Sequence, residues 1–212
     1  VETGRVVAGL RQIVPDLPFE LTVRELANGD GGELPGRMRF RVIEGDHRVP
    51  VLIYRVDLAR APKFDRVKAQ SLGVPVAAWA PLQRGERVQL DGREFEPWMV
   101  MGPSRQGLAF GFMTDTRPVA EAAGFLRGVD LLISEGTYGD SALEQKADAY
   151  GHMTFVQAAT IARAAGAGAL WLTHFSPAME EPVAFLENAT RIFHDTTIGF
   201  TGLSTSLNFR DE

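Results

Sequence analysis

Two histidines and one aspartate in this sequence carry side chains that bind metal ions, and each lies beside an apolar run. Asp115 follows the run 110–113, and His174 follows the run 170–172. Because strand ends in α/β folds converge on one site, these two side chains are expected to lie close together. His47 stands in a turn ahead of another apolar run, from where it could approach the same place on a neighbouring strand.

These three side chains form a set that suits a metal ion. Two imidazoles and one carboxylate match the preferences of zinc and manganese, and the two oxygens of a carboxylate allow it to bridge a pair of ions. The three residues are nevertheless scattered along the chain without a compact motif. Residue types and positions by themselves leave two interpretations, which are metal binding and ordinary capping or surface roles.

The first third of the chain is predicted to form a helix and three strands. Apolar residues at helical spacing predict a helix over 6–14. Alternation of apolar and polar residues predicts strands over 19–26 and 37–43, and a continuous apolar run predicts a more buried strand over 49–56. His47 lies in the connection between the last two of these strands.

The rest of the chain alternates between strands and helices, which predicts an α/β fold. Thr154 and Gln157 have the spacing of a capping box, and Gly166 is suited to end the helix that they begin. Pro118 marks the start of an earlier helix. Further strands are predicted over 88–90, 98–101, 108–113, 131–134, 170–173 and 198–203, with a loop over 138–151 and a last helix over 182–193.

The composition predicts one folded unit in a reducing compartment. The 212 residues are 45% hydrophobic, which is enough for one sizeable core, so we expect a single domain over 1–212. No uncharged apolar run reaches the length of about 18 residues that a membrane helix needs, and no signal peptide is present. The absence of cysteine excludes a disulfide framework. A cytoplasmic protein without membrane association is expected.

The charge distribution bears on nucleic-acid binding. The formal net charge of -5 gives no overall attraction to RNA, so any RNA contact must come from a local basic patch. The segment 57–92 has a weak secondary-structure pattern and is predicted to be an excursion from the core. Its basic residues are candidates for phosphate contacts, and a solvated helix face is the equal alternative; they are Arg60, Lys63, Arg66 and Lys68.

Asp46–Val56 places a histidine seven residues ahead of a Tyr-Arg pair, and four more segments follow in chain order: Met113–Arg117, Asp130–Tyr138, Tyr150–Ala159 and Leu172–Ser176. These five segments resemble motifs of the ribonuclease Z family, which belongs to the metallo-β-lactamase superfamily. Met113–Arg117 resembles the family's Gly-Asp-Thr-Arg segment, and Asp130–Tyr138 its His-Glu-Ala-Thr-Phe stretch. Tyr150–Ala159 is similar to its His-Ser-Thr and Gln-Ala-Ala helix start, and Leu172–Ser176 to its Leu-Thr-His-Ile-Ser. The order and separations agree over nearly the whole chain.

The resemblance implies a fold and a metal centre. The fold would be a metallo-β-lactamase-like αββα sandwich whose N-terminal portion is missing from this chain. His47, Asp115 and His174 would be metal ligands. Asp115 would bridge two zinc ions, with manganese or magnesium as alternatives. His152 would contact the scissile phosphate or assist proton transfer, and Glu135 would orient it.

The resemblance also implies that this chain holds only part of the ligand set. The family's remaining ligands lie in a His-x-His-x-Asp-His element, which this sequence does not contain. Two zinc ions that share a bridging carboxylate need about four or five further protein ligands. We therefore expect this chain to bind metal poorly and not to cleave RNA by itself, unless upstream residues or a partner chain complete the site.

The implied function is that of a metal-dependent endoribonuclease that hydrolyses a phosphodiester near the tRNA 3′ end by attack of a metal-bound hydroxide. Its partners would be precursor tRNA, clamped by an inserted arm at 57–92, and a second copy in a homodimer. Departures from the family at Ser134 and Met153, and after His174, fall near the substrate and spare the ligands. Two alternatives remain: a divergent metallo-β-lactamase-fold hydrolase of another phosphodiester or ester, and a non-catalytic fragment or RNA-binding subunit.

Overall fold

The computed structural model describes residues 2–14 and 16–210, which divide into two compact units. Within these residues, unit 1 consists of 2–58 and 108–208, and unit 2 consists of 59–107 with the short segment 209–210. Each unit buries a hydrophobic cluster of its own.

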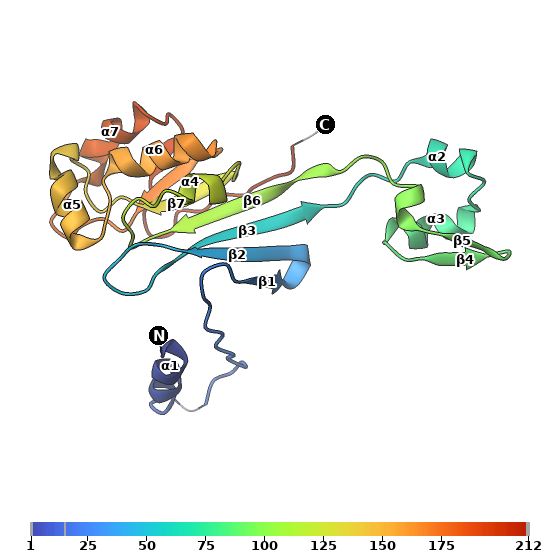
Figure 1. The fold of residues 1–212 in the computed structure, drawn as a ribbon, viewed down its shortest axis with the longest axis horizontal. Coiled ribbons are helices and arrows are strands. Elements are labelled where there is room, and N and C mark those ends of the chain that lie inside the picture. Colours follow the sequence, from blue (N-terminus) through green and yellow to red (C-terminus); the bar gives the residue numbers. More distant parts are fainter. Residues whose placement is uncertain (1, 15, 211–212) are drawn as a thin grey trace. The chain divides into compact units, whose positions relative to one another are not determined.

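A seven-stranded mixed sheet is the main feature of unit 1. Its strands lie in the order β1-β2-β3-β6-β7-β8-β9, with antiparallel pairs from β1 to β3 and parallel pairs from β6 to β9 (Figure 1). Helices supply the crossovers that parallel neighbours need. The bounds are β1 Gly31–Leu34, β2 Met38–Glu44, β3 Leu52–Arg60, β6 Arg105–Met113, β7 Leu131–Glu135, β8 Leu170–Thr173 and β9 Thr196–Ile198.

The parallel half of the sheet places three strand ends next to one another. Met113 of β6 pairs with Ser134 of β7, and Glu135 of β7 pairs with Thr173 of β8. β7 is buried along nearly all of its length, as its continuous apolar run predicts. The loops that leave these three strands at their carboxyl ends therefore start from neighbouring points, and residues on them can meet.

The longest helix of unit 1 packs on this half of the sheet. α6 spans Phe155–Ala165 and contacts β7 and β8. Thr154 and Gln157 form the capping box that begins it, and Gly166, with φ 63°, ends it in a left-handed conformation. Both predicted helix ends are confirmed. Four of its buried residues are alanines, which allow the helix to lie close to the strands.

Shorter helices and turns complete unit 1. α4 and α7 both contact α6. None of the helices in the described part of the chain is both long enough and apolar enough to cross a membrane. The bounds are α1 Thr3–Arg11, α4 Ala122–Phe125, α5 Glu144–Tyr150 and α7 Leu186–Thr190, with 3-10 turns η1 Pro35–Arg37, η3 Ser141–Leu143 and η4 Pro182–Phe185.

Unit 2 is a small subdomain with its own core. Its elements are α2 Arg66–Ser71, α3 Val76–Gln83, η2 Pro97–Met99 and the antiparallel hairpin of β4 Val88–Leu90 and β5 Arg93–Phe95. Ala78, Leu82 and Val100 are fully buried in this core. The unit extends further along the chain than the predicted excursion at 57–92. A separate core explains how a segment with a weak sequence pattern folds.

Together these elements confirm the predicted α/β class. Unit 1 consists of a helical layer against one large sheet. Residues 2–14 and 16–210 do not form the second large sheet that a complete αββα sandwich would contain.

The predicted strand at 19–26 is wrong. Its residues alternate between apolar and polar, but they pair with no strand of the sheet, whose edge beside β2 is occupied by β1. Phe19, Leu21 and Val23 are all exposed. Alternation is a local property, whereas a strand also needs a neighbour for its main-chain hydrogen bonds.

Four other predicted elements differ in the structure. The 98–101 strand is replaced by η2, which Pro97 begins, because proline has the fixed φ of a helical turn. The 138–151 loop contains α5, in which only Ala147 is buried, so its sequence lacks an apolar stripe. The last helix ends early, at Thr190, and the last strand lies at Thr196–Ile198, so it shares only Ile198 with the predicted strand at 198–203.

Candidate metal centre

Four side chains of unit 1 converge on one point. The ring centroids of His47 and His152 lie 5.0 Å apart, and those of His152 and His174 lie 5.3 Å apart. One donor atom from each of His47, Asp115 and His152 lies within 4.8 Å of the others. Asp115 also reaches His174, with Oδ1 3.0 Å from Nε2. The structure thus brings together the three predicted ligands and the predicted catalytic histidine.

Each of the four residues lies where the chain enters or leaves a strand or helix. Asp115 follows β6 and His174 follows β8, at the carboxyl ends of parallel strands. His47 lies in the loop between β2 and β3, and His152 lies between α5 and α6. The sheet order, rather than closeness in sequence, therefore assembles the cluster.

The backbone is left-handed at two of the predicted ligands. φ is 52° at Asp115 and 55° at His174. A non-glycine residue in this region costs on the order of 1–3 kcal/mol, although aspartate and histidine are found there more often than most residues. Such conformations concentrate at functional sites, where the surrounding structure holds them in place.

Gly151 fixes the orientation of the His47 ring. Nδ1 of His47 lies 2.9 Å from the carbonyl oxygen of Gly151. A carbonyl only accepts hydrogen bonds, so Nδ1 carries the proton and Nε2 carries the lone pair. Gly151 has φ 87°, and a Cβ at this position would overlap Nδ1 of His47. Only glycine permits the two segments to approach so closely.

The loop that carries His47 is fixed to the loop that carries Asp115. The backbone N–H of Asp46 donates to Oγ1 of Thr116 at 2.8 Å, and the N–H of Arg117 donates to the Asp46 carbonyl at 2.8 Å. The Arg117 guanidinium also lies 3.0 Å from Oδ1 of Asp46. These contacts set the separation of the two predicted ligands.

Glu135 is a fully buried carboxylate that accepts four hydrogen bonds. Oε1 accepts from the Thr116 N–H at 2.6 Å and from His152 Nδ1 at 3.1 Å. Oε2 accepts from the Thr137 hydroxyl at 2.7 Å and from the Met153 N–H at 3.1 Å. Because a carboxylate only accepts, the proton of His152 is on Nδ1 and its Nε2 lone pair is free.

This donor set fits a metal ion. Among the hydrogen bonds that the described residues form, none uses Nε2 of His47 or of His152. His174 Nε2 and Asp115 Oδ1 face each other at 3.0 Å. Imidazoles with one nitrogen anchored on oxygen and the other nitrogen free are typical of metal-binding histidines. Nitrogen donors combined with a carboxylate suit zinc.

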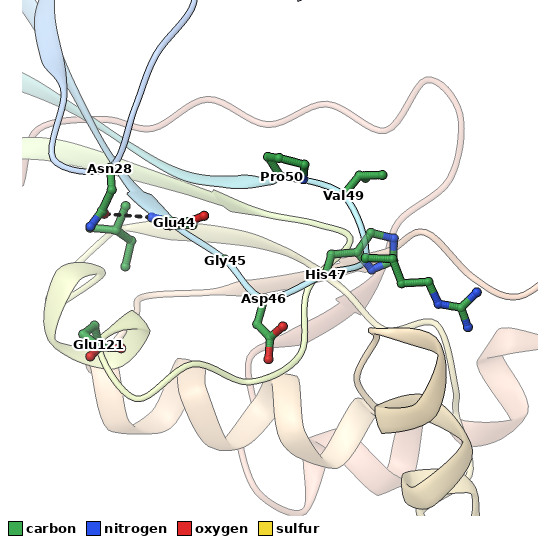
Figure 2. Close-up of a pocket in the computed structure, with 10 residues that line it drawn as sticks. Asn28, Glu44, Gly45, Asp46, His47, Val49, Pro50 and Glu121 are labelled. Atoms are coloured by element: carbon green, nitrogen blue, oxygen red, sulfur yellow. Dashed lines mark hydrogen bonds between the residues drawn. The ribbon is translucent and has the colours of Figure 1, made fainter. Parts of the chain in front are cut away.

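A cavity of about 670 Å³ is lined in part by His47 (Figure 2). The guanidinium of Arg48, at the same cavity, lies 4.9 Å from the centre of the Tyr150 ring. The charged residues of the lining are Glu44, Asp46, Arg48 and Glu121. The cavity is therefore polar, and His47 is the residue of the cluster that lines it.

Tyr138 is the group near this centre with a perturbed proton affinity. Burial raises the pKa of Tyr138 above its usual value of 10.0, and the charges of Tyr150 and Glu135 act in the same direction. The positive charge of Arg48 opposes them. The phenol is therefore held in its neutral form over the physiological pH range.

The four predicted RNA-binding residues belong to unit 2, whereas the candidate metal-binding cluster belongs to unit 1. Arg60 donates to the backbone carbonyl of Arg210 at 2.6 Å. The Lys68 ammonium lies 3.5 Å from two backbone carbonyl oxygens of unit 2. Lys63, Arg66 and Lys68 are exposed, and the last two lie on α2.

Sequence reasoning missed two residues of the centre. Thr137 touches both Glu135 and His174, and Gly151 contacts His47 across 104 positions of sequence. A glycine after a helix is a recognisable signal, but α5 itself was not predicted. Nothing in the sequence distinguishes Thr137 from other threonines.

Comparisons with known proteins agree with this geometry. Residues 12–175 match the family described as the beta-lactamase superfamily domain. The chain is 39% identical over 208 residues to ribonuclease Z of Clostridium kluyveri, covering 98% of this chain and 69% of that protein. It is 41% identical over 215 residues to ribonuclease Z of Lachnospira eligens, covering 99% of this chain and 69% of that protein.

A solved structure shows the same fold. The metallo-beta-lactamase fold protein YhfI from Bacillus subtilis superposes with a TM-score of 0.51 at 20% identity, covering 81% of this chain and 50% of that chain. The sequence matches and the shared fold lead to one conclusion. This chain belongs to the metallo-β-lactamase superfamily and, within it, to the ribonuclease Z family.

Proposed function

We propose that this protein is a metal-dependent endoribonuclease that hydrolyses a phosphodiester of precursor tRNA near its 3′ end. Identities of 39% and 41% to ribonuclease Z proteins over nearly the whole chain support this activity. The observation that carries the proposal is the convergence of the imidazoles of His47, His152 and His174 on the carboxylate of Asp115. No purely structural role requires three imidazoles at one point.

We propose zinc as the metal, with manganese or magnesium as substitutes and two ions in a complete site. His47, Asp115 and His174 would hold it, and Asp115 has two oxygens with which to bridge a pair. A bound ion would act as a Lewis acid on the phosphodiester and would activate water for its hydrolysis. The nitrogen-rich donor set favours zinc over magnesium, which prefers oxygen ligands.

His152 and Glu135 would serve the reacting group. The Nδ1–H of His152 is held by Glu135 at 3.1 Å, which leaves Nε2 directed away from the carboxylate. From there it would contact the scissile phosphate or carry a proton to the leaving group. The buried carboxylate would stabilise the imidazolium that forms when the ring takes up a proton.

The basic residues of unit 2 would contact the RNA backbone. Lys63, Arg66 and Lys68 are exposed, and Arg60 lies at the end of β3. Contacts to phosphates position a nucleic acid without reading its sequence. We further propose a homodimer in the cytoplasm, and the absence of cysteine suits that reducing compartment.

The test measures metal content and cleavage together. The full-length gene product, its His174→Ala variant and a His194→Ala control are loaded with zinc, dialysed and analysed for bound metal. His194 is a matched control because its side chain is 96% exposed and it is absent from the cluster. Cleavage is then measured on precursor tRNA and on bis(p-nitrophenyl) phosphate.

The proposal predicts that the protein and His194→Ala bind zinc, that His174→Ala loses it, and that precursor tRNA is the better substrate. Cleavage of the small diester alone would instead support a hydrolase of another phosphodiester. Above a pH of about 7 the imidazoles are neutral and available to a metal ion. If the protein binds no zinc under these conditions, the proposal is wrong and a non-catalytic RNA-binding role is favoured.

A further inference from the structure

The hydroxyl of Thr137 lies at the junction between the buried carboxylate and one predicted metal ligand. Its Oγ1 is 2.7 Å from Oε2 of Glu135, 3.1 Å from Nδ1 of His174 and 3.0 Å from the carbonyl oxygen of His174. Thr137 itself is buried, with 6% of its surface exposed. No other side chain of the described residues touches both Glu135 and the His174 ring within hydrogen-bond distance.

A hydroxyl has one proton to donate, and two of these three neighbours can only accept it. The contact with Glu135 is the shortest, and a hydrogen bond to a carboxylate is roughly twice as strong as one between neutral groups. The proton therefore goes to Glu135. Oγ1 is left with lone pairs for His174, so Nδ1 of that ring must donate.

The direction of this hydrogen bond decides which nitrogen of His174 is free. With the proton on Nδ1, Nε2 carries the lone pair and faces Oδ1 of Asp115 at 3.0 Å. Two acceptors at this distance repel each other unless a cation lies between them or they share a proton. A metal ion in contact with both atoms would relieve this repulsion.

We propose that Thr137 is a positioning residue. Its hydroxyl donates to the Glu135 carboxylate and accepts from Nδ1 of His174, which leaves Nε2 of His174 as the atom that binds the metal. The inference rests on the proposed metal-dependent function. Glu135 fixes the His152 ring directly, because Nδ1 of His152 donates to Oε1 of this carboxylate. Through Thr137 the same carboxylate would also fix the His174 ring. One buried carboxylate would thus set the protonation pattern of two of the three histidines.

The experiment compares three variants of the full-length gene product. Thr137→Val removes the hydroxyl and keeps the shape of the side chain, and Thr137→Ser keeps the hydroxyl and removes a methyl group. Thr160→Val is the control, because the Thr160 hydroxyl likewise donates a hydrogen bond of 2.7 Å, here to a backbone carbonyl, on the exposed side of α6 and away from the cluster. Competition with a chromophoric chelator gives the zinc Kd, and ¹⁵N NMR of the zinc-loaded protein shows which His174 nitrogen carries hydrogen.

We expect Thr137→Val to weaken zinc binding about 10- to 100-fold, which is the usual effect of removing a partner of a metal-binding histidine. Thr137→Ser and Thr160→Val should bind zinc like the unaltered protein, and the unaltered protein should show hydrogen on Nδ1 of His174. A merely structural role would lower the melting temperature of Thr137→Val without changing its Kd.

The possible failures are distinct. If the unaltered protein binds zinc and Thr137→Val binds it equally well, the inference about Thr137 is wrong and the metal centre stands. If Thr137→Ser is as weak as Thr137→Val, packing rather than the hydroxyl is responsible and the inference also fails. If the unaltered protein takes up no zinc, both the inference and the proposed function are overturned.

Discussion

Replacing Gly151 with alanine tests whether the close contact of this glycine with His47 holds the metal centre together. The new Cβ would overlap Nδ1 of His47, which lies 2.9 Å from the Gly151 carbonyl. The ring must then turn away, and its Nε2 leaves the point that it shares with His152. Gly166→Ala is the matched control, because Gly166 also ends a helix with positive φ but a Cβ there meets no atom within 4 Å.

The backbone penalty is similar in both variants. Alanine would be placed at φ 87° in one and at φ 63° in the other, and a left-handed conformation costs an L-residue roughly 1–2 kcal/mol. In a protein of this size each kcal/mol lowers Tm by about 2–4 °C. Gly151→Ala also loses the hydrogen bond of His47, a further 0.5–1.5 kcal/mol or so. Displacing the support of a metal-binding histidine lowers metal affinity by about 10- to 100-fold.

Scanning calorimetry gives the Tm of each variant, and chelator competition gives its zinc Kd. We expect the two Tm values to fall together to within a few degrees, while only Gly151→Ala loses about 10-fold or more in zinc affinity. Equal zinc affinities in the two variants would refute the reasoning, since the contact with His47 would then have no bearing on the centre. Equal losses would refute it too, because backbone strain alone would explain them.

Three other outcomes are expected. Glu135→Gln should lower the free energy of unfolding by about 3 kcal/mol or more in urea titrations, because an amide cannot accept from all four buried donors; a loss no larger than that of exposed Glu180→Gln would contradict this. Because the pKa of Tyr138 is raised in the folded protein, the unfolded chain loses this proton at a lower pH. The free energy of unfolding should therefore fall as pH rises above 10.0, and it should fall less in Tyr138→Phe. An absorbance titration in which every tyrosine ionises normally would contradict this prediction. Lys63→Ala and Arg66→Ala should each weaken RNA binding and reduce its salt slope by about 1, unlike exposed Arg163→Ala, and unchanged slopes would argue against unit 2 as the RNA-binding surface.

The sequence predicts best where a local pattern and the tertiary environment agree. The strands ending at Met113, Glu135 and Thr173 are apolar runs, and burial in a parallel sheet requires such runs. The capping box at Thr154 likewise acts within one turn of its own helix. The strand expected at 19–26 failed because pairing depends on a distant partner, which no local alternation reveals.

The same distinction applies to the candidate metal centre. Spacing alone left His47, Asp115 and His174 undecided between metal binding and structural roles, and only the resemblance to a family favoured the metal. The hydrogen bonds that fix the rings come from Gly151 and Thr137, which lie 104 and 37 positions away from the histidines they contact. Contacts of that range belong to the folded topology, so a single sequence could not supply them.

The positive φ values of Asp115 and His174 limit how this centre could be redesigned for another metal. Exchanging either residue for cysteine or glutamate would alter the donor atom and would also place a less tolerant side chain in a left-handed backbone, at φ 52° or 55°. Asparagine fits such a backbone, but it offers a neutral donor in place of a charged one or an imidazole. The main-chain conformation of these two loops therefore restricts which residues can replace Asp115 and His174, whatever metal the new donor atoms would suit.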